Sequence, residues 1–233
     1  MNPVYNRVRE LITYVEESQQ DQIELAAIAC ANAIEKGGML QAFGSGHSEA
    51  GAMEVAHRAG GFIPTKKIME PARGSYESIE GVGSSFMKKV DVRNHDVVFI
   101  ISNSGRNPLP IEVAIGAKQK GAITIAITAL EASRKMTSKH SCGKNLYQLS
   151  DIVIDNCVPE GDCGCTVEGY DSPICGMSMI TTSVIIQAIT YRTTGILIQR
   201  GITPPIYKSQ NIDGGREFNE QLEEKYFDRL YHI

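Results

Sequence analysis

The sequence predicts an α/β fold, a doubly wound sheet of five parallel strands with helices on both faces, arranged as a three-layer sandwich. Short apolar runs alternate with segments of helical periodicity along most of the chain. One run, residues 97–101, is apolar throughout, which is typical of a strand buried on both faces. Two runs are followed at once by loops rich in glycine and serine. Alternating strands and helices imply a parallel sheet with right-handed crossovers.

The elements are predicted in the following order. Two helices come first, because apolar residues recur at helical spacing at Val4, Val8, Leu11, Ile12 and Val15, and again at Ile23, Ala26, Ala27, Cys30 and Ile34. Strands are predicted at residues 39–43, 62–68, 96–101, 123–127 and 151–155. Helices are predicted at residues 49–59, from the loop after the third strand to Lys120, from about residue 176 to 200, and in the tail at 217–231. Residues 157–173 are expected to be irregular.

Composition limits the class of protein. The 233 residues are 42% hydrophobic, enough to build a core, and we expect one domain over residues 1–233. A helical pair at about 1–36 and a helical extension at about 176–233 would flank its centre. The net charge of −4 argues against a nucleic-acid partner. The N-terminus lacks the apolar stretch of a signal peptide and no segment is apolar enough to span a membrane, so we expect a cytoplasmic protein.

The two polar loops are the main candidates for a ligand site. The first is Gly44-Ser-Gly-His-Ser48 and the second begins Ser102-Asn-Ser-Gly105. Glycines let backbone amides approach an anion, and a helix start supplies free N–H groups. Because both loops leave strands at the carboxyl edge of one sheet, we expect them to converge on a phosphate. The alternative for either loop is a structural strand-to-helix turn. The candidate phosphate-binding residues are Gly46, His47, Ser48, Ser102, Asn103, Ser104 and Asn107.

Three segments carry a family resemblance. Phe43-Gly-Ser-Gly-His-Ser48, Ile101-Ser-Asn-Ser-Gly105 and Ile123-Thr-Ile-Ala-Ile-Thr128 resemble the sugar isomerase (SIS) domain family, which includes phosphoheptose isomerase. The likeness covers residues 22–128, and nearly the whole chain is similar to a group of small SIS proteins related to phosphosugar isomerases. The resemblance implies a phosphorylated sugar as ligand, bound by Ser48, Ser102 and Ser104. Asn107 stands where many members have Thr or Ser.

The resemblance also implies an assembly. Pockets of this family lie near subunit contacts, so we expect a homodimer or homotetramer. The two N-terminal helices and the C-terminal helix are expected to pack against a partner chain. A neighbouring subunit can complete the active site in this family, so one chain need not hold the full set of residues.

The chain departs from the family at the zinc site. Phosphoheptose isomerase carries a His and a Glu, four residues apart, on the helix after the first loop. Spacing places Glu54 and Arg58 at those positions here, and an arginine side chain has no acceptor for a metal. We therefore expect neither a metal nor another cofactor, and heptose phosphate as substrate is in doubt.

Catalysis of an aldose–ketose isomerisation needs a base beside the carbonyl and an acid to open the sugar ring. The candidate catalytic residues are Glu77 and Glu80, in the polar connection after the second strand, and His140, after the fourth. The alternative for the two glutamates is a solvated helix start, where acidic residues are favoured. The function expected first is isomerisation of a sugar phosphate through an enediol. An amino-sugar phosphate lyase, etherase or deaminase and a sugar-phosphate sensor without catalysis remain as alternatives.

The cysteines form no recognisable framework. Six are present, and without a secretory signal they do not indicate disulfides. The spacing of Cys157, Cys163, Cys165 and Cys175 matches no common zinc pattern. We interpret this segment as a cysteine-rich loop that oxidation can cross-link.

Overall fold

The computed structural model describes residues 2–70 and 72–231, so the extreme ends of the expected domain and Pro71 lie outside the described residues. Its central sheet has five strands: β1 (Leu40–Gly44), β2 (Thr65–Lys67), β3 (Val97–Ile101), β4 (Ile123–Thr128) and β5 (Ile152–Asp155). They lie in the order β2-β1-β3-β4-β5, and each neighbouring pair is parallel. The prediction of a doubly wound five-stranded parallel sheet is confirmed. The strand order reverses between β1 and β3, so their carboxyl ends form the crevice where such sheets bind ligands.

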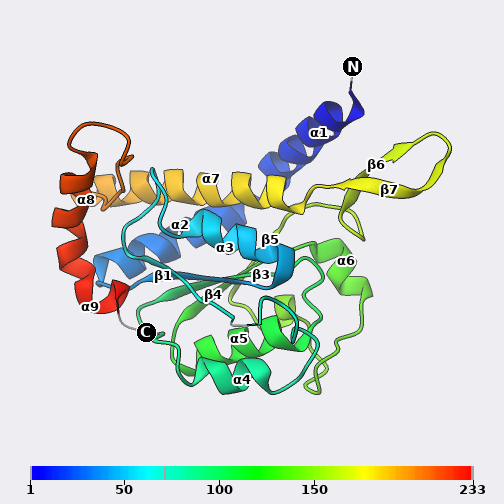
Figure 1. Cartoon of the computed structure of the whole chain (residues 1–233), viewed down its shortest axis with the longest axis horizontal. Coiled ribbons are helices and arrows are strands. Elements are labelled where there is room, and N and C mark those ends of the chain that lie inside the picture. Colours follow the sequence, from blue (N-terminus) through cyan, green and yellow to red (C-terminus); the bar gives the residue numbers. More distant parts are fainter. Residues whose placement is uncertain (1, 71, 232–233) are drawn as a thin grey trace.

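Helices cover both faces of the sheet, giving the predicted three layers (Figure 1). One layer contains α1 (Pro3–Ser18), α2 (Gln20–Glu35), α3 (Glu49–Val55) and the long α7 (Ser178–Gln199). The other contains α4 (Val82–Met87) and α5 (Pro108–Gln119). A short helix, α6 (Leu130–Lys135), follows β4 at the carboxyl edge of the sheet.

The sheet separates two apolar cores. Phe99 and Ile101 of β3 face the core formed with α2, α3 and α7, whereas Val98 and Ile100 face the core formed with α4 and α5. This alternation is the two-residue period of a strand, and all five residues of β3 are buried. Removing apolar surface from water stabilises a fold by roughly 25 cal/mol for each Å². These two cores are therefore the main source of the stability of the fold.

Two elements differ from the prediction. The helix expected over residues 49–59 ends at Val55, because Ala56 is extended and His57 has a positive φ of 54°. The stretch expected to be irregular contains an antiparallel hairpin of β6 (Cys163–Val167) and β7 (Tyr170–Gly176). The hairpin lies beside α1 and projects from the body of the molecule (Figure 1).

Two of the helical elements expected at a subunit contact pack within their own chain. Helix α2 fills the core under α7. The tail forms α8 (Gly215–Glu223), η3 (Glu224–Tyr226) and α9 (Phe227–Leu230), and Leu230 packs on Met39 and Ile63 beside the outer strand β2. The Arg229 guanidinium also forms an ion pair with the buried Asp96 at 2.7 Å. Part of the apolar surface of both elements is therefore buried within the chain, while Leu25 of α2 and Phe227 of α9 stay exposed. None of the helices in the described part of the chain is long and apolar enough to cross a membrane.

Candidate functional site

The first loop is a tight turn that only glycine permits at two positions. A Cβ on Gly44, the last residue of β1, would lie 2.1 Å from the carbonyl oxygen of Ser48. Gly46 begins the short helix η1 (Gly46–Ser48) with a positive φ of 57°. The Ser48 N–H donates to the Ser45 carbonyl at 3.1 Å, which closes the turn. The Ser45 hydroxyl is buried and has no partner among the described residues, so it is available to a ligand.

The second loop, after β3, is held by the neighbouring strand β4. The buried Ser102 donates its N–H to the Ile127 carbonyl at 3.1 Å, and its hydroxyl accepts from the Gly105 N–H at 3.3 Å. The carbonyl of Asn103 accepts from the Ala129 N–H and from the Thr128 hydroxyl, each at 3.0 Å. These bonds fix the backbone of the loop, which presents the Ser104 side chain partly to solvent.

The two loops open into one cavity of about 350 Å³. Its lining includes five of the candidate residues: Ser48, Ser102, Asn103 and Ser104 for phosphate binding, and Glu77 for catalysis. The other residues of the lining are Ser45, Ala129, Ala132, Met136, Pro159, Gly161 and Asp162. The structure thus brings the serine loops together with Glu77. Among the described residues, Gly46, His47 and Asn107 do not line this cavity, and His47 is exposed.

Glu77 is held in place by two hydrogen bonds from residues at the start of α5. The Asn107 side-chain amide donates to the Glu77 carboxylate at 2.9 Å, and the Leu109 N–H donates to the Glu77 carbonyl at 3.2 Å. The chain before Glu77 forms a turn over residues 70–74, in which the Glu70 carboxylate accepts from the Gly74 N–H at 2.6 Å. Asn107 is the residue that precedes α5, with extended backbone. The Asn107 side chain therefore orients the Glu77 carboxylate and does not itself line the cavity.

Glu80 and His140 meet each other outside the cavity lining. The Glu80 carboxylate accepts from the Ser141 N–H at 2.8 Å and from the Ser141 hydroxyl. These hydrogen bonds, with a smaller contribution from His140, lower the pKa of Glu80. The His140 Nε2 lies 3.6 Å from Glu80 and 3.7 Å from Glu112, while its Nδ1 accepts from the Cys142 N–H at 3.0 Å. This cluster fastens residues 138–142 to the start of α4.

Glu112 is a central residue of that cluster which the sequence analysis missed. Its carboxylate is 2% exposed and accepts from the N–H groups of Gly81 and Gly83 at 2.6 and 2.7 Å, and from Ser84. The acid therefore satisfies free N–H groups at the start of α4. The available signal was an acidic residue inside an otherwise apolar helix, which is rarely buried without partners.

Asp162 is a second residue that sequence reasoning missed. Its carboxylate accepts from the N–H groups of Met177 and Ser178 at 3.1 and 2.7 Å, and from the Ser178 hydroxyl at 2.8 Å. It thereby caps α7 across the base of the hairpin, and it also lines the cavity. Nothing local predicts this contact, because the residues it joins are separated by the hairpin.

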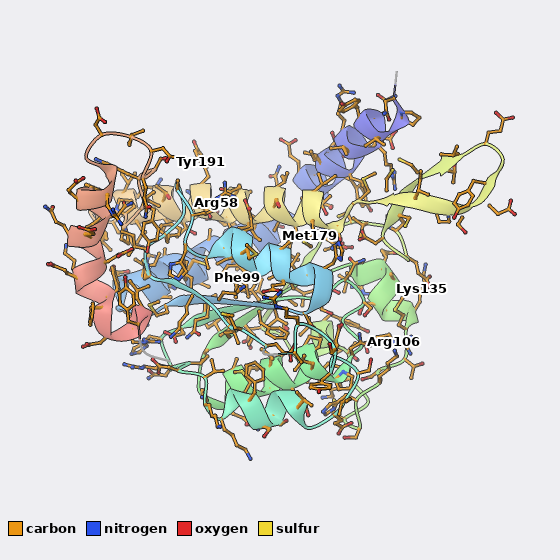
Figure 2. The ribbon with its side chains drawn as sticks, in the orientation of Figure 1. Arg58, Phe99, Arg106, Lys135, Met179 and Tyr191 are labelled. Atoms are coloured by element: carbon orange, nitrogen blue, oxygen red, sulfur yellow. The ribbon has the colours of Figure 1, made fainter. Side chains whose placement is uncertain are left out.

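The described lining of the cavity contains two carboxylates and no cationic side chain. The second loop carries one arginine, Arg106, whose Nε is buried without a partner. Figure 2 shows Arg106 and Lys135 on the same side of the molecule, near the loops after β3 and β4. An anion in the cavity would therefore be held chiefly by hydroxyl and backbone N–H groups.

The positions that correspond to the zinc ligands form a salt bridge. The Arg58 guanidinium pairs with the Glu54 carboxylate, which also accepts from the Gln187 side-chain amide at 2.6 Å. Within residues 2–70 and 72–231, no three His, Cys, Asp or Glu side chains converge closely enough to hold a metal ion.

Comparison with known proteins agrees with this fold and loop arrangement. The SIS domain model matches residues 5–129. The UPF0309 protein lmo0025 of Listeria monocytogenes is 44% identical over 229 residues, 98% of each chain. The chain therefore belongs to the SIS domain family and, within it, to the UPF0309 proteins, which confirms the resemblance seen in the sequence.

Solved structures show the same fold at low identity. Phosphoheptose isomerase from Francisella tularensis has a TM-score of 0.58 and 15% identity, covering 82% of this chain and 95% of its own. Phosphoheptose isomerase from Neisseria gonorrhoeae has a TM-score of 0.56 and 15% identity, covering 83% of this chain and 96% of its own.

Proposed function

We propose that this chain binds a sugar phosphate in the cavity between the two serine loops and isomerises it between aldose and ketose. The observation that carries the proposal is the convergence of Ser48, Ser102 and Ser104 with one carboxylate, Glu77, in a cavity of about 350 Å³. A volume of this order suits a small polar ligand. The phosphoheptose isomerases of similar fold support the choice of a phosphosugar.

The phosphate is proposed to lie against the serine hydroxyls and the start of η1. Hydrogen bonds to a charged ligand contribute about 1.5–3 kcal/mol each, so several hydroxyls and amides can bind a phosphate without a fixed cation. This remote binding energy orients the reacting carbons of the sugar.

Glu77 is proposed as the base. Its carboxylate takes the proton from the hydroxyl-bearing carbon next to the carbonyl, the electron pair of that C–H bond forms the enediol double bond, and the carbonyl oxygen takes up a proton from solvent. Glu77 then returns its proton to the former carbonyl carbon while the neighbouring hydroxyl releases its proton to solvent and becomes the new carbonyl, which completes the exchange of aldose and ketose. Asn107 holds the carboxylate in place through its hydrogen bond of 2.9 Å.

Glu80 and His140 take a positioning role in this proposal. They hold residues 138–142 against the connection that carries Glu77, and neither is among the described residues lining the cavity. An acid for ring opening would then come from the substrate's own hydroxyls, solvent or a neighbouring subunit.

Self-association is part of the proposal. Helix α7 exposes Tyr191 at 84% and Ile198 at 60%, and Figure 2 shows Tyr191 on the outer side of that helix. Exposed apolar side chains on one helix are suited to a protein contact. We propose a homodimer or homotetramer, which analytical ultracentrifugation of wild type and Tyr191→Glu tests directly.

The experiment that tests the function combines binding with proton exchange. A thermal-shift screen of sugar phosphates, each paired with its free sugar, should give stabilisation by a phosphorylated member only. That ligand is then incubated with protein in D₂O, and the enediol predicts deuterium at the exchanged carbon, detected by NMR.

Three variants separate the possible outcomes. Glu77→Gln should keep the thermal shift and lose exchange, and the exposed Glu131→Gln serves as the matched control. Binding without exchange in wild type would favour a sensor. A thermal shift unaffected by Ser48→Ala together with Ser104→Ala would remove the phosphate site from the serine loops.

A further inference from the structure

The hairpin β6–β7 places two cysteines diagonally across its strands. Cys165 pairs with Ile174, so Cys175 follows its direct partner by one position, and Cys163 pairs with Gly176 at the base. In a regular strand, successive side chains point to opposite faces, which would separate Cys175 from Cys165.

The backbone of Cys175 breaks that alternation. Its φ is +66°, a left-handed conformation uncommon for a residue with a side chain. Both cysteines pack partly buried against the same apolar cluster, which includes Leu11 of α1 and Met177 at the start of α7. The two side chains therefore reach the same face of the hairpin.

The two thiols also influence each other. Partial burial raises the pKa of the Cys165 thiol above its ordinary value, and the neighbouring Cys175 thiol raises it further. Both residues are free thiols in this structure.

We propose that Cys165 and Cys175 form a reversible modification site, a disulfide made by exchange with a small-molecule disulfide such as oxidised glutathione. One thiol of the pair loses its proton and attacks a sulfur of the oxidant, which releases one glutathione thiolate and leaves a mixed disulfide. The second thiolate then attacks the protein sulfur of that bond and releases the second glutathione. Two protein thiols are oxidised and one disulfide is reduced, so the electrons balance.

The other cysteines are less suited to this reaction. Cys30 is fully buried, and burial raises the pKa of its thiol strongly. Cys157 lies before the hairpin, where its thiol contacts the Ser18 hydroxyl and the Asp155 carbonyl. Cys142 lies on another loop, where its thiol contacts the Lys144 carbonyl. Cys163 shares a strand with Cys165 and faces Gly176 across the hairpin.

The modification site adjoins the candidate functional site. Asp162 lines the cavity and directly precedes β6, while its partners Met177 and Ser178 directly follow β7. A covalent bond across the hairpin would thus close a short loop whose two ends meet at Asp162. The inference itself does not depend on the proposed enzymatic function.

The experiment treats reduced, full-length protein with oxidised glutathione, blocks the remaining thiols, and digests the unfolded product with trypsin and chymotrypsin. Cleavage after Tyr170 separates Cys175 from Cys157, Cys163 and Cys165. Mass spectrometry should find the two peptides joined in wild type and separated after reduction by dithiothreitol.

Serine variants identify the partner. The cross-link should persist in Cys157→Ser and Cys163→Ser and disappear in Cys165→Ser and Cys175→Ser. Oxidation should raise the melting temperature of wild type and of Cys163→Ser, but not of Cys165→Ser, because a disulfide restricts the unfolded chain. Any of three results would overturn the proposal. They are reaction of every cysteine of the oxidised wild type with the blocking reagent, a cross-link that survives in Cys165→Ser, and a cross-link between different chains.

Discussion

The Asn107 side-chain amide donates a hydrogen bond of 2.9 Å to the Glu77 carboxylate, joining the residue before α5 to a segment thirty positions earlier in the chain. This contact orients one of the two carboxylates in the described lining of the cavity, the other being Asp162. Asn107 therefore acts through Glu77, as a positioning residue.

Replacing Asn107 should lower turnover with little change in substrate binding. Asn107→Ala removes the donor and should reduce kcat about 10-fold, because a hydrogen bond to a charged group contributes about 1.5–3 kcal/mol. Asn107→Asp adds a like charge beside Glu77 and should reduce kcat further. Steady-state kinetics that separate kcat from KM provide the measurement, and Asn94→Ala, exposed before β3, is the control. A rise in KM with an unchanged kcat would instead assign Asn107 to substrate binding.

The serine loops should carry the affinity for phosphate. Ser48→Ala and Ser104→Ala each remove a hydroxyl that lines the cavity, and each should weaken binding of the best sugar phosphate about 10-fold. Isothermal titration calorimetry measures the effect. Binding of the free sugar should change much less, and equal losses for both ligands would argue against a phosphate contact.

Gly74 should be needed for the shape of the first loop. It has a positive φ of 89°, and a Cβ there would lie 2.8 Å from the Gly46 nitrogen. Gly74→Ala should therefore displace the first loop and weaken phosphate binding about 10-fold. Gly60→Ala is a matched control, because Gly60 also has a positive φ of 79° but no atom within 4 Å of the added Cβ. Both variants should lose about 1 kcal/mol of stability from the backbone conformation, and only Gly74→Ala should lose binding.

Glu112 should be important for stability. Glu112→Ala leaves the N–H groups of Gly81 and Gly83 without their buried acceptor. Loss of a buried charged partner of this kind costs about 3 kcal/mol. Urea unfolding at neutral pH measures the change, and the exposed Glu131→Ala should stay within about 0.5 kcal/mol of wild type. A small effect at Glu112 would mean that water replaces the carboxylate.

The attachment of the C-terminal helix should weaken in acid. The Arg93 hydrogen bond, and then the charge of Arg229, lower the pKa of Asp91 from its ordinary value of 3.8, although partial burial opposes this. A lowered folded-state pKa stabilises the fold at pH values above 3.8 and ceases to do so as the pH falls through the folded-state value. Asp91→Asn should therefore destabilise the protein by about 1 kcal/mol at pH 6, and the difference from wild type should shrink as the pH is lowered below 3.8. Chemical unfolding of both proteins over a series of pH values tests the sign.

The sequence alone predicted the sheet because its strands are marked locally. Apolar runs such as Val97–Ile101 and the glycines at the ends of β1 and β3 need no distant partner to be recognised. The hairpin escaped prediction because Cys163–Val167 and Tyr170–Gly176 are neither apolar nor regularly alternating. In the folded chain the hairpin packs against apolar residues of α1, a contact that local sequence does not reveal.

The same distinction applies to the site. Local sequence determined the five strands, the two serine loops and the family, because backbone conformation at glycine and the burial of apolar runs are set by neighbouring residues. Only the tertiary structure decided that Glu77 joins the loops, that Glu80 and His140 meet at Glu112 away from the cavity lining, and that Asp162 enters it. These contacts join residues far apart in the chain, and hydrogen bonds between such residues exist only once the packed layers bring their segments together.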